Sequence, residues 1–300
     1  MVSSIKTVAV IGAGTMGNGI AHVFAQHGCK VSLIDVSQGQ LDKAIGQITK
    51  NLERQLSKNI ITEAVKQSAL TNLHTSTSIN AGVQHAQLII EAATENTDIK
   101  LNIFKQLAVV APAAAILASN TSSISITKIA AVTDRPEKVI GMHFMNPVPV
   151  MKLVEIINGY ATSKETTDAI IALTLQLDKT PCTVNDYPGF IANRILMPMI
   201  NEAMCSLYEG VAGVEEIDTV MKLGMAHPMG PLQLADFIGL DVCLSILQVL
   251  HHGFGNPKYA PCPLLVNMVT AGRLGVKTGE GFYTYTAGNK ELVISGRFKK

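Results

Sequence analysis

One histidine and one glutamate bracket two prolines in the stretch HFMNPVPVMKLVEI, residues 143–156. Pro147 and Pro149 cannot donate to a central sheet ladder, so the chain between His143 and Glu155 must turn or leave the sheet. A chain that leaves and returns can bring the two side chains together, either for chemistry or for packing alone. Histidine, with an ordinary pKa of about 6.5, can then remove a hydroxyl proton, while a carboxylate on its other ring nitrogen fixes the tautomer. The alternative is structural: a core histidine bonded to a backbone carbonyl, and a solvated glutamate on an edge strand.

A glycine-rich loop near the N-terminus favours the chemical explanation. The sequence VIGAGTMGNG places Gly12, Gly14 and Gly17 in the spacing G-x-G-x-x-G directly after a strand and at the start of a helix. In this pattern the glycines allow a tight turn, the approach of a pyrophosphate and close packing of helix on strand. The helix N-terminus offers its unpaired N–H groups to the phosphates. We therefore predict a dinucleotide contact from the whole loop, namely Gly12, Ala13, Gly14, Thr15, Met16 and Gly17.

An acidic residue stands where such a loop requires one. Asp35 ends the next strand-like run, 18 residues after Gly17 (35 − 17 = 18). Its carboxylate can accept hydrogen bonds from an adenine-ribose hydroxyl and repel a 2′-phosphate. No arginine or lysine lies at positions 36–42, which favours NAD over NADP. The alternative explanation for Asp35 is a cap for the helix that follows.

The first half of the chain alternates apolar strand-like runs with helix-like segments. The expected strands are Thr7–Gly12, Cys29–Asp35, Ala86–Ala93, Ala114–Asn120 and Lys138–Phe144. Continuous apolar strands separated by helices predict a Rossmann-type, doubly wound parallel sheet in the α/β class, covered on both faces. Ligands bind such sheets outside the carboxyl ends of the strands, where this sequence carries ATEN, SNTSS and HFMNP. For Thr121–Ser123 a helix cap is an equally good explanation.

From Pro188 onward the pattern becomes helical, with long runs at Gly189–Gly210, Glu215–Met225 and Leu232–Gly253. Asn, Asp, Pro and Gly cluster in TVNDYPG, residues 183–189, which indicates a joint. We predict an NAD-binding Rossmann domain over residues 1–185 and an all-helical C-terminal substrate and dimerisation domain over 186–300.

Composition excludes several classes of protein. The net charge is +1, so no global field favours nucleic acid or an anionic membrane. The five cysteines contain no C-x-x-C pair, and the eight histidines form no H-E-x-x-H motif, so neither a disulfide framework nor a metal site is expected. No apolar run approaches the roughly 20 residues that span a bilayer, and no signal peptide is recognisable. We expect a cytoplasmic protein without a membrane or nucleic-acid partner.

Taken together, GAGTMG, ENTDIK, SNTSSISI, HFMNPVPVMKLVEI, PGFIANRI, GPLQLADFIGLD and KTGEGFY resemble the L-3-hydroxyacyl-CoA dehydrogenase family, and its single-function short-chain members most closely. The match runs over nearly the whole chain. It implies NAD-linked oxidation of an L-3-hydroxyacyl-CoA, such as 3-hydroxybutyryl-CoA, to the 3-ketoacyl-CoA or the reverse. It also implies a homodimer.

The resemblance assigns roles position by position. His143 matches the catalytic base and Glu155 its partner, while Ser119 and Asn193 match the residues that hold the substrate oxygen. Positions matching cofactor contacts are Glu95, Lys100, Ser119, Asn146 and Lys277.

A basic face recurs at Lys50, Arg54 and Lys58, which could meet the phosphates of coenzyme A or simply be solvated. The resemblance supports Lys58 as a contact with the acyl-CoA, and Asn51 stands where relatives often carry serine.

Two rivals stay open. One is a β-hydroxyacid dehydrogenase that uses a lysine acid on a small free acid. The other is a binding or structural protein that keeps the fold and the cofactor without turnover. Acyl chain length and physiological direction do not follow from the sequence.

Overall fold

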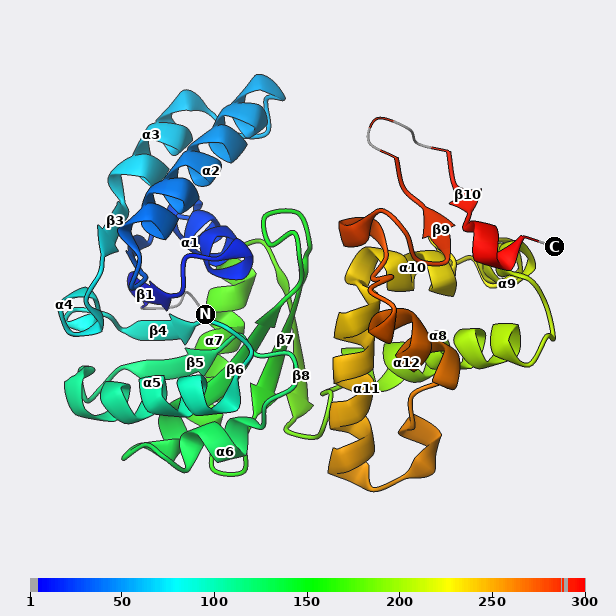
Figure 1. The fold of residues 1–300 in the computed structure, drawn as a ribbon. Coiled ribbons are helices and arrows are strands. Elements are labelled where there is room, and N and C mark those ends of the chain that lie inside the picture. Colours follow the sequence, from blue (N-terminus) through cyan, green and yellow to red (C-terminus); the bar gives the residue numbers. More distant parts are fainter. Residues whose placement is uncertain (1–4, 287, 289–290, 300) are drawn as a thin grey trace. The chain divides into compact units, whose positions relative to one another are not determined.

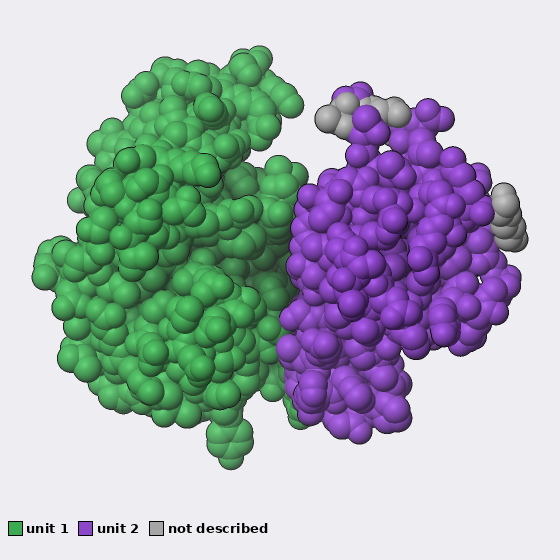
Figure 2. Space-filling model, viewed as in Figure 1, with its two compact units in different colours: residues 1–187 green, residues 188–300 purple. Residues whose placement is uncertain are grey.

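Apolar β-branched runs build the sheet that organises the first part of the protein. The computed structural model describes residues 5–286, 288 and 291–299, and the chain divides into two compact units, Met1–Tyr187 and Pro188–Lys300 (Figure 2). Each unit has its own hydrophobic core. We describe the units one at a time.

The first unit contains an eight-stranded sheet flanked by helices (Figure 1). Its strands are β1 Thr7–Ile11, β2 Lys30–Ile34, β3 Leu73–Ser76, β4 Leu88–Glu91, β5 Ile116–Ser119, β6 Val139–Phe144, β7 Leu153–Asn158 and β8 Thr180–Asn185. Its helices are α1 Thr15–Gln26, α2 Gln38–Ser57, α3 Glu63–Thr71, α4 Ile79–Val83, α5 Thr97–Val110, α6 Ile126–Ala130 and α7 Lys164–Gln176, with a short 3₁₀ turn at Pro136–Lys138.

The strand order is β3-β2-β1-β4-β5-β6-β7-β8. The first six strands follow the doubly wound order 3-2-1-4-5-6, in which a dinucleotide crosses the carboxyl edge where the order reverses, here between β1 and β4. The predicted Rossmann fold is therefore confirmed, and all five expected strands are present within one or two residues. The sheet is mixed rather than parallel, because β7 runs antiparallel to β6. The eight residues between them are too few for the crossover that a parallel return needs.

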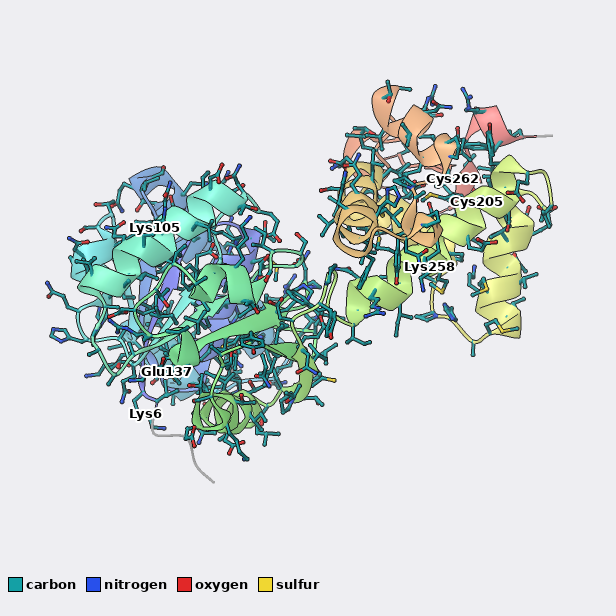
Figure 3. The ribbon with its side chains drawn as sticks, turned by 90° about the horizontal axis from the view of Figure 1, so that it is seen from below. Lys6, Lys105, Glu137, Cys205, Lys258 and Cys262 are labelled. Carbon is teal, nitrogen blue, oxygen red and sulfur yellow. The ribbon has the colours of Figure 1, made fainter. Side chains whose placement is uncertain are left out.

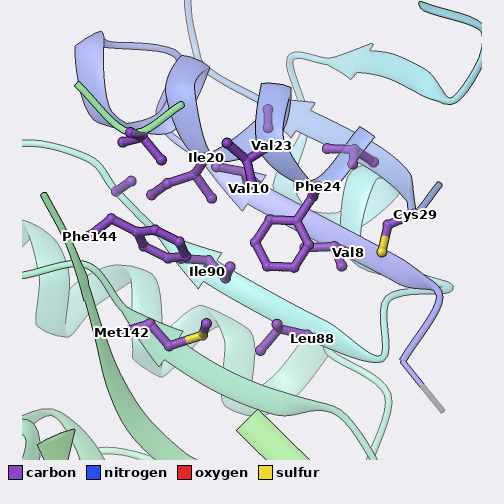
Figure 4. Packing of buried hydrophobic residues seen from close by; sticks show 14 of the residues in the cluster. Val8, Val10, Ile20, Val23, Phe24, Cys29, Leu88, Ile90, Met142 and Phe144 are labelled. Carbon is purple, nitrogen blue, oxygen red and sulfur yellow. The ribbon is translucent and has the colours of Figure 1, made fainter. Parts of the chain in front are cut away.

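The core between α1 and the sheet fixes the helix that starts at the glycine loop. Ile20, Val23 and Phe24 pack from α1 onto strand residues such as Val10 (Figure 4). Phe24 also meets Phe144 of β6 edge to face, with ring centroids 6.4 Å apart. This contact ties one end of β6 to the helix that begins at the glycine loop. The glycine loop and β6, which carries His143, therefore share one core.

In its described residues, the second unit is helical apart from one short ribbon. It consists of α8 Ala192–Tyr208, α9 Val214–Thr219, a π-helical turn Val220–Gly224, α10 Pro231–Ile238, α11 Leu240–Phe254, α12 Pro263–Thr270, 3₁₀ turns at Pro257–Tyr259, Val276–Thr278 and Gly296–Phe298, and the ribbon β9 Tyr283–Thr284 with β10 Val293–Ile294. The expected helical C-terminal domain is confirmed, with the ribbon as an addition. The thiols of Cys205 on α8 and Cys262 are neighbours in its core (Figure 3), where burial and the second thiol raise the pKa of Cys205 to about 12.

Two of the expected long helices are interrupted. The run over Leu232–Gly253 breaks at Gly239, whose φ of +101° turns α11 by 97° from α10. A residue with a side chain is strained at that φ, so the glycine sets the break. The run over Glu215–Met225 widens after Thr219 into the π-helical turn.

A buried aspartate joins α10 to the C-terminal ribbon. The Asp236 carboxylate accepts hydrogen bonds from the backbone N–H groups of Phe282 and Tyr283 at 3.0 and 2.9 Å, and from the Tyr285 hydroxyl at 3.0 Å. Burial raises the pKa of Asp236 to about 6, aided by the nearby Asp218 and opposed by these hydrogen bonds. Because this carboxyl is only 1% exposed, its ionisation is coupled to the stability of the unit.

Candidate active site

His143 and Glu155 meet inside the first unit. Strands β6 and β7 pair antiparallel with these two residues directly opposite each other, and His143 Nδ1 lies 2.7 Å from Glu155 Oε2. Both residues are buried. The expected turn and return of the chain is confirmed, and the alternative of a solvated glutamate is wrong. A carboxylate only accepts, so Nδ1 carries the proton and Nε2 presents a lone pair, as a base requires.

A serine that the sequence analysis did not single out faces the other side of the imidazole. Ser122 Oγ lies 3.1 Å from His143 Nε2, in the loop that follows β5. A hydroxyl donor in hydrogen-bond range of Nε2 shows that this nitrogen can meet a substrate hydroxyl in the same way. Ser122 belongs to the SNTSS segment, whose polar residues at a strand end were the available signal.

Glu95 holds that serine-rich loop in place. Its Oε1 accepts from Thr121 Oγ1 at 2.6 Å, from the Ser122 and Ser123 N–H groups at 2.9 and 3.1 Å, and from Ser123 Oγ at 2.9 Å. Lys100 Nζ lies 3.4 Å from its other oxygen. Partial burial alone would raise the pKa of Glu95, but the Lys100 charge and these hydrogen bonds lower it below its ordinary value. Glu95 therefore acts as a charged anchor for the loop that carries Ser122, and its contact with the cofactor stays a prediction.

Ser119 and Lys100 lie deeper in the unit, on either side of Glu91. Ser119 Oγ donates to Glu91 Oε2 at 2.7 Å, and Lys100 Nζ contacts both oxygens of Glu91 at 2.8 and 2.9 Å. All three side chains are fully buried. The sequence analysis gave Glu91 no role, because within the run AQLIIEAA it had no partner at a recognisable spacing.

The glycine loop has the shape that a pyrophosphate needs. Gly12 has φ +101°, and a Cβ there would lie 2.6 Å from the Ala92 carbonyl oxygen; a Cβ at Gly17 would lie 1.7 Å from the Gly12 oxygen. A Cβ at Gly14 would meet nothing within 4 Å, so the loop is open where a ligand must approach. Turn, open approach and close packing are thus each present at the glycine expected to supply them, and the loop fits a dinucleotide.

Asp35 ties the end of β2 to this loop. Its Oδ2 accepts from the Ala13 N–H at 2.8 Å and its Oδ1 from the Ser37 N–H at 3.0 Å. The explanation of Asp35 as a helix cap is wrong, because the Ser37 side chain caps α2 by accepting from the Gln40 N–H. The contact between Asp35 and a ribose stays a prediction.

A cavity of about 440 Å³ lies beside the loop. It is lined by the loop and α1 (Ala13, Gly14, Thr15, Asn18, Gly19), by α2 (Gln40, Lys43, Ala44, Gln47, Asn51) and by Asn146, Pro147, Val148 and Pro149. The structure thus brings Asn51 and Asn146 together with the glycine loop. Lys58 caps the far end of α2 and does not line this cavity.

A buried lysine fixes the segment that forms one wall of the cavity. Lys179 Nζ donates to the carbonyl oxygens of Val148 and Met151 at 2.6 and 2.7 Å. Burial, together with the nearby Lys152, lowers the pKa of Lys179 to about 8. The ammonium therefore serves as a clamp on the loop between β6 and β7.

Two predicted residues belong to the second unit. Asn193 is buried near the start of α8, and Lys277 forms an ion pair with Asp241. Their place in the site stays a prediction.

Two further findings concern the described residues. No group of three or more His, Cys, Asp or Glu side chains among them is placed to hold a metal ion. No single helix in the same part of the chain is long and apolar enough to cross a membrane; the bent pair α10 and α11 passes that test only jointly.

Comparison with known proteins identifies the family. The model for the NAD-binding domain of 3-hydroxyacyl-CoA dehydrogenase matches residues 7–187, and the model for its C-terminal domain matches residues 189–285. A 3-hydroxybutyryl-CoA dehydrogenase of Bradyrhizobium diazoefficiens is 54% identical, over 95% of this chain and 97% of that protein. A probable 3-hydroxybutyryl-CoA dehydrogenase of Bacillus subtilis is also 54% identical, over 94% and 98%.

A solved structure agrees with this assignment. The crystal structure of (S)-3-hydroxybutyryl-CoA dehydrogenase from Ralstonia eutropha superposes with a TM-score of 0.92 at 53% identity, covering 94% of this chain and all of that one. With both domain models matched and relatives more than half identical over almost its full length, the chain belongs to the NAD-dependent 3-hydroxyacyl-CoA dehydrogenase family.

Proposed function

We propose that this enzyme interconverts L-3-hydroxybutyryl-CoA and its 3-ketoacyl-CoA, with His143 as proton acceptor and Glu155 as its orienting partner. The observation that carries the proposal is the buried 2.7 Å contact between His143 Nδ1 and Glu155 Oε2 at the edge of a dinucleotide-binding sheet. The names of the most similar relatives support the short acyl-CoA substrate.

The mechanism follows from the tautomer. In the oxidative direction Nε2 of His143 takes the proton of the C3 hydroxyl, and the imidazolium that forms is stabilised by the buried carboxylate of Glu155. Bound NAD supplies the hydride acceptor for C3. In the reductive direction the imidazolium returns its proton to the C3 oxygen. The Glu155 side chain keeps Nε2 in the basic form between turnovers.

The remaining site assignments belong to the same proposal. Ser119 and Asn193 hold the reacting end of the substrate, and Asn51 and Lys58 contact the coenzyme A part. The cofactor is held by the loop Gly12, Ala13, Gly14, Thr15, Met16 and Gly17 with Asp35, Glu95, Lys100, Asn146 and Lys277. The cavity that already joins Asn51 and Asn146 to the loop supports this arrangement.

We also infer a cytoplasmic homodimer. The second unit exposes several large apolar side chains, among them Val211, Val220, Leu223 and Met225. A groove of about 380 Å³, lined mainly by apolar residues of α8, α9 and the π-helical turn, lies in the same unit. Exposed apolar surface of this kind is typical of a face that another chain covers.

The test is the loss of NADH absorbance when purified protein meets acetoacetyl-CoA. NADPH and free acetoacetate serve as parallel controls. A rate that requires both NADH and the CoA group supports reaction, cofactor and substrate class together. Bound NADH without turnover on acetoacetyl-CoA, or equal rates on free acetoacetate, would refute the proposal.

A further inference from the structure

Two cysteines meet in the core of the second unit. Cys205 lies on α8 and Cys262 directly precedes α12, and their thiols are neighbours (Figure 3). Both thiols are free; Cys262 is only 1% exposed, whereas Cys205 is partly exposed. The proposed reaction gives neither thiol a role, so the pair calls for an explanation of its own.

A buried asparagine on α8 holds the two segments together. Asn201 lies one helical turn before Cys205, so both side chains project from the same face of α8. Asn201 Oδ1 accepts from the Cys262 N–H at 2.8 Å, and Asn201 Nδ2 donates to the Ala260 carbonyl oxygen at 3.0 Å. Because these bonds satisfy buried backbone groups, they fix the start of α12 on α8. The two thiols are therefore neighbours through the packed structure of the unit.

Two thiols in this position can be oxidised to a disulfide. A peroxide first converts the more accessible Cys205 Sγ to a sulfenic acid and releases one water. Cys262 Sγ then attacks that sulfur, which forms the S–S bond and releases a second water. The two thiols together lose two hydrogens and two electrons, and the O–O bond of the peroxide is reduced. A dithiol reverses the reaction by thiol–disulfide exchange.

Protonation of Cys205 controls how fast this reaction starts. Burial and the second thiol raise the pKa of Cys205 to about 12, so very little thiolate exists at neutral pH. Since the thiolate is the reactive form, brief exposure to a peroxide leaves the pair reduced. The rate of oxidation should rise by about tenfold for each unit of pH near neutrality, as the thiolate fraction does.

We propose that Cys205 and Cys262 are a redox modification site, at which sustained oxidation by a peroxide forms a reversible disulfide that locks α8 to the start of α12. The two cysteines are 57 positions apart (262 − 205 = 57), and α9, α10 and α11 lie between them. Closing so long a stretch restricts the unfolded chain and thereby stabilises the folded unit. This proposal does not rest on the cofactor or the acyl substrate.

The experiment maps the disulfide in the full-length native protein. The protein is incubated with hydrogen peroxide at pH 8, alkylated in denaturant and digested with trypsin without reduction. Cleavage after lysine and arginine places Cys205, Cys243 and Cys262 in separate peptides, residues 195–222, 223–258 and 259–273. We expect the first and third peptides to be recovered as one species, two hydrogens lighter than their sum, which dithiothreitol separates. Cys243 should be recovered in its alkylated form.

Thermal unfolding provides the second measurement. The oxidised protein should unfold at a temperature about 5–10 °C higher than the reduced protein, and dithiothreitol should restore the original value. Cys205→Ser and Cys262→Ser should each abolish this shift. Cys182→Ser changes an exposed cysteine of β8 in the first unit and should keep both the cross-link and the shift.

Three outcomes would overturn the proposal: separate recovery of the two peptides after oxidation, a disulfide to Cys243 in place of this one, or an unchanged unfolding temperature in the cross-linked protein. The peptide map of the native protein decides the matter even if a serine variant does not fold. A protein that forms the cross-link but does not reduce acetoacetyl-CoA would contradict the proposed function and leave the redox site in place.

Discussion

His143 and Glu155 are direct partners across the antiparallel strands β6 and β7, and their side chains share a 2.7 Å hydrogen bond. Side chains directly opposite each other in such a pair lie on the same face of the sheet. A slip of one residue would move Glu155 to the other face. The backbone ladder therefore aligns the base with its carboxylate.

Removing either member of this pair should abolish most of the turnover. We expect His143→Ala and Glu155→Gln each to lower kcat by roughly 10²- to 10⁴-fold, the usual contribution of a positioned base or its orienter. The measurement is steady-state reduction of acetoacetyl-CoA, with the NADH dissociation constant as a check on the cofactor site. Glu165→Gln is the matched control. Near-normal kcat in both variants would mean that the proton acceptor is another group.

Asp35 should determine the choice between NAD and NADP. Replacing it with serine removes the negative charge that repels a 2′-phosphate, so we expect the preference for NADH over NADPH to fall by roughly tenfold or more. The ratio of kcat/KM for the two cofactors measures it. The control is Asp42→Asn, which removes a negative charge from an exposed position of α2 and should leave the ratio unchanged. If Asp35→Ser keeps the full preference, the ribose contact lies elsewhere.

Lys179 should matter for the wall of the cavity although it is remote from the chemistry. Lys179→Met removes both hydrogen bonds to the Val148–Met151 segment, and we expect unfolding to become easier by about 1–3 kcal/mol. The KM for acetoacetyl-CoA should rise severalfold while the His143–Glu155 pair remains. Lys152→Met, at an exposed lysine bonded to one carbonyl, is the control. If Lys179→Met and Lys152→Met changed the free energy of unfolding and the KM by the same amounts, Lys179 would not be a clamp on this segment.

The stability of the protein should depend on the ionisation of Asp236. Its pKa is about 6 in the folded state and ordinarily 3.8, so the folded state binds the proton more tightly. The stabilisation is present below pH 4 and is lost as pH rises through about 6. Relative to Asp236→Asn, the free energy of unfolding should fall by roughly 2 kcal/mol between pH 4 and pH 7. Denaturant titrations at the two pH values measure it, and a constant difference would contradict it.

A charged residue on the exposed face of the second unit should prevent dimer formation. Leu223 is 80% exposed on the π-helical turn, and we expect Leu223→Glu to yield a monomer where the native protein has twice the 32.0 kDa of one chain. Light scattering on a sizing column gives the mass. Val109→Glu, at an 83% exposed position of α5, should leave the dimer intact. A native monomer, or a dimeric Leu223→Glu, would place the interface elsewhere or exclude it.

Much of this architecture could be predicted because its signals are local. The five long strands are continuous apolar runs, and the glycine loop has a fixed spacing. Strand β3 was missed because its residues are polar or half-exposed and lack the apolar run that identifies a buried strand. The antiparallel direction of β7 and the break at Gly239 depend on chain geometry that an apolar pattern does not carry.

Prediction of the candidate site from the sequence was limited in a similar way. His143 and Glu155 stood out because prolines separate them, and Glu95 and Asn146 follow strands. Glu91 did not stand out, and Lys100 was named only through the family resemblance, as a cofactor contact, because an ion pair buried between a strand and a helix appears in sequence only as two ordinary charged residues. Ser122 was visible as one of several polar residues at a strand end, without a sign that it would face the imidazole.

The loop between β6 and β7 can vary in sequence without changing how His143 and Glu155 are aligned. Hydrogen bonds between the two strands align the base with its carboxylate, so this alignment does not depend on the side chains of the intervening residues, of which those at positions 146–149 also line the cavity. Substrate selectivity could therefore drift, or be re-engineered, within this loop while proton transfer is preserved. A library confined to positions 147–149, which leaves the predicted cofactor contact Asn146 unchanged, would vary the wall of the cavity while the His143–Glu155 pair is kept.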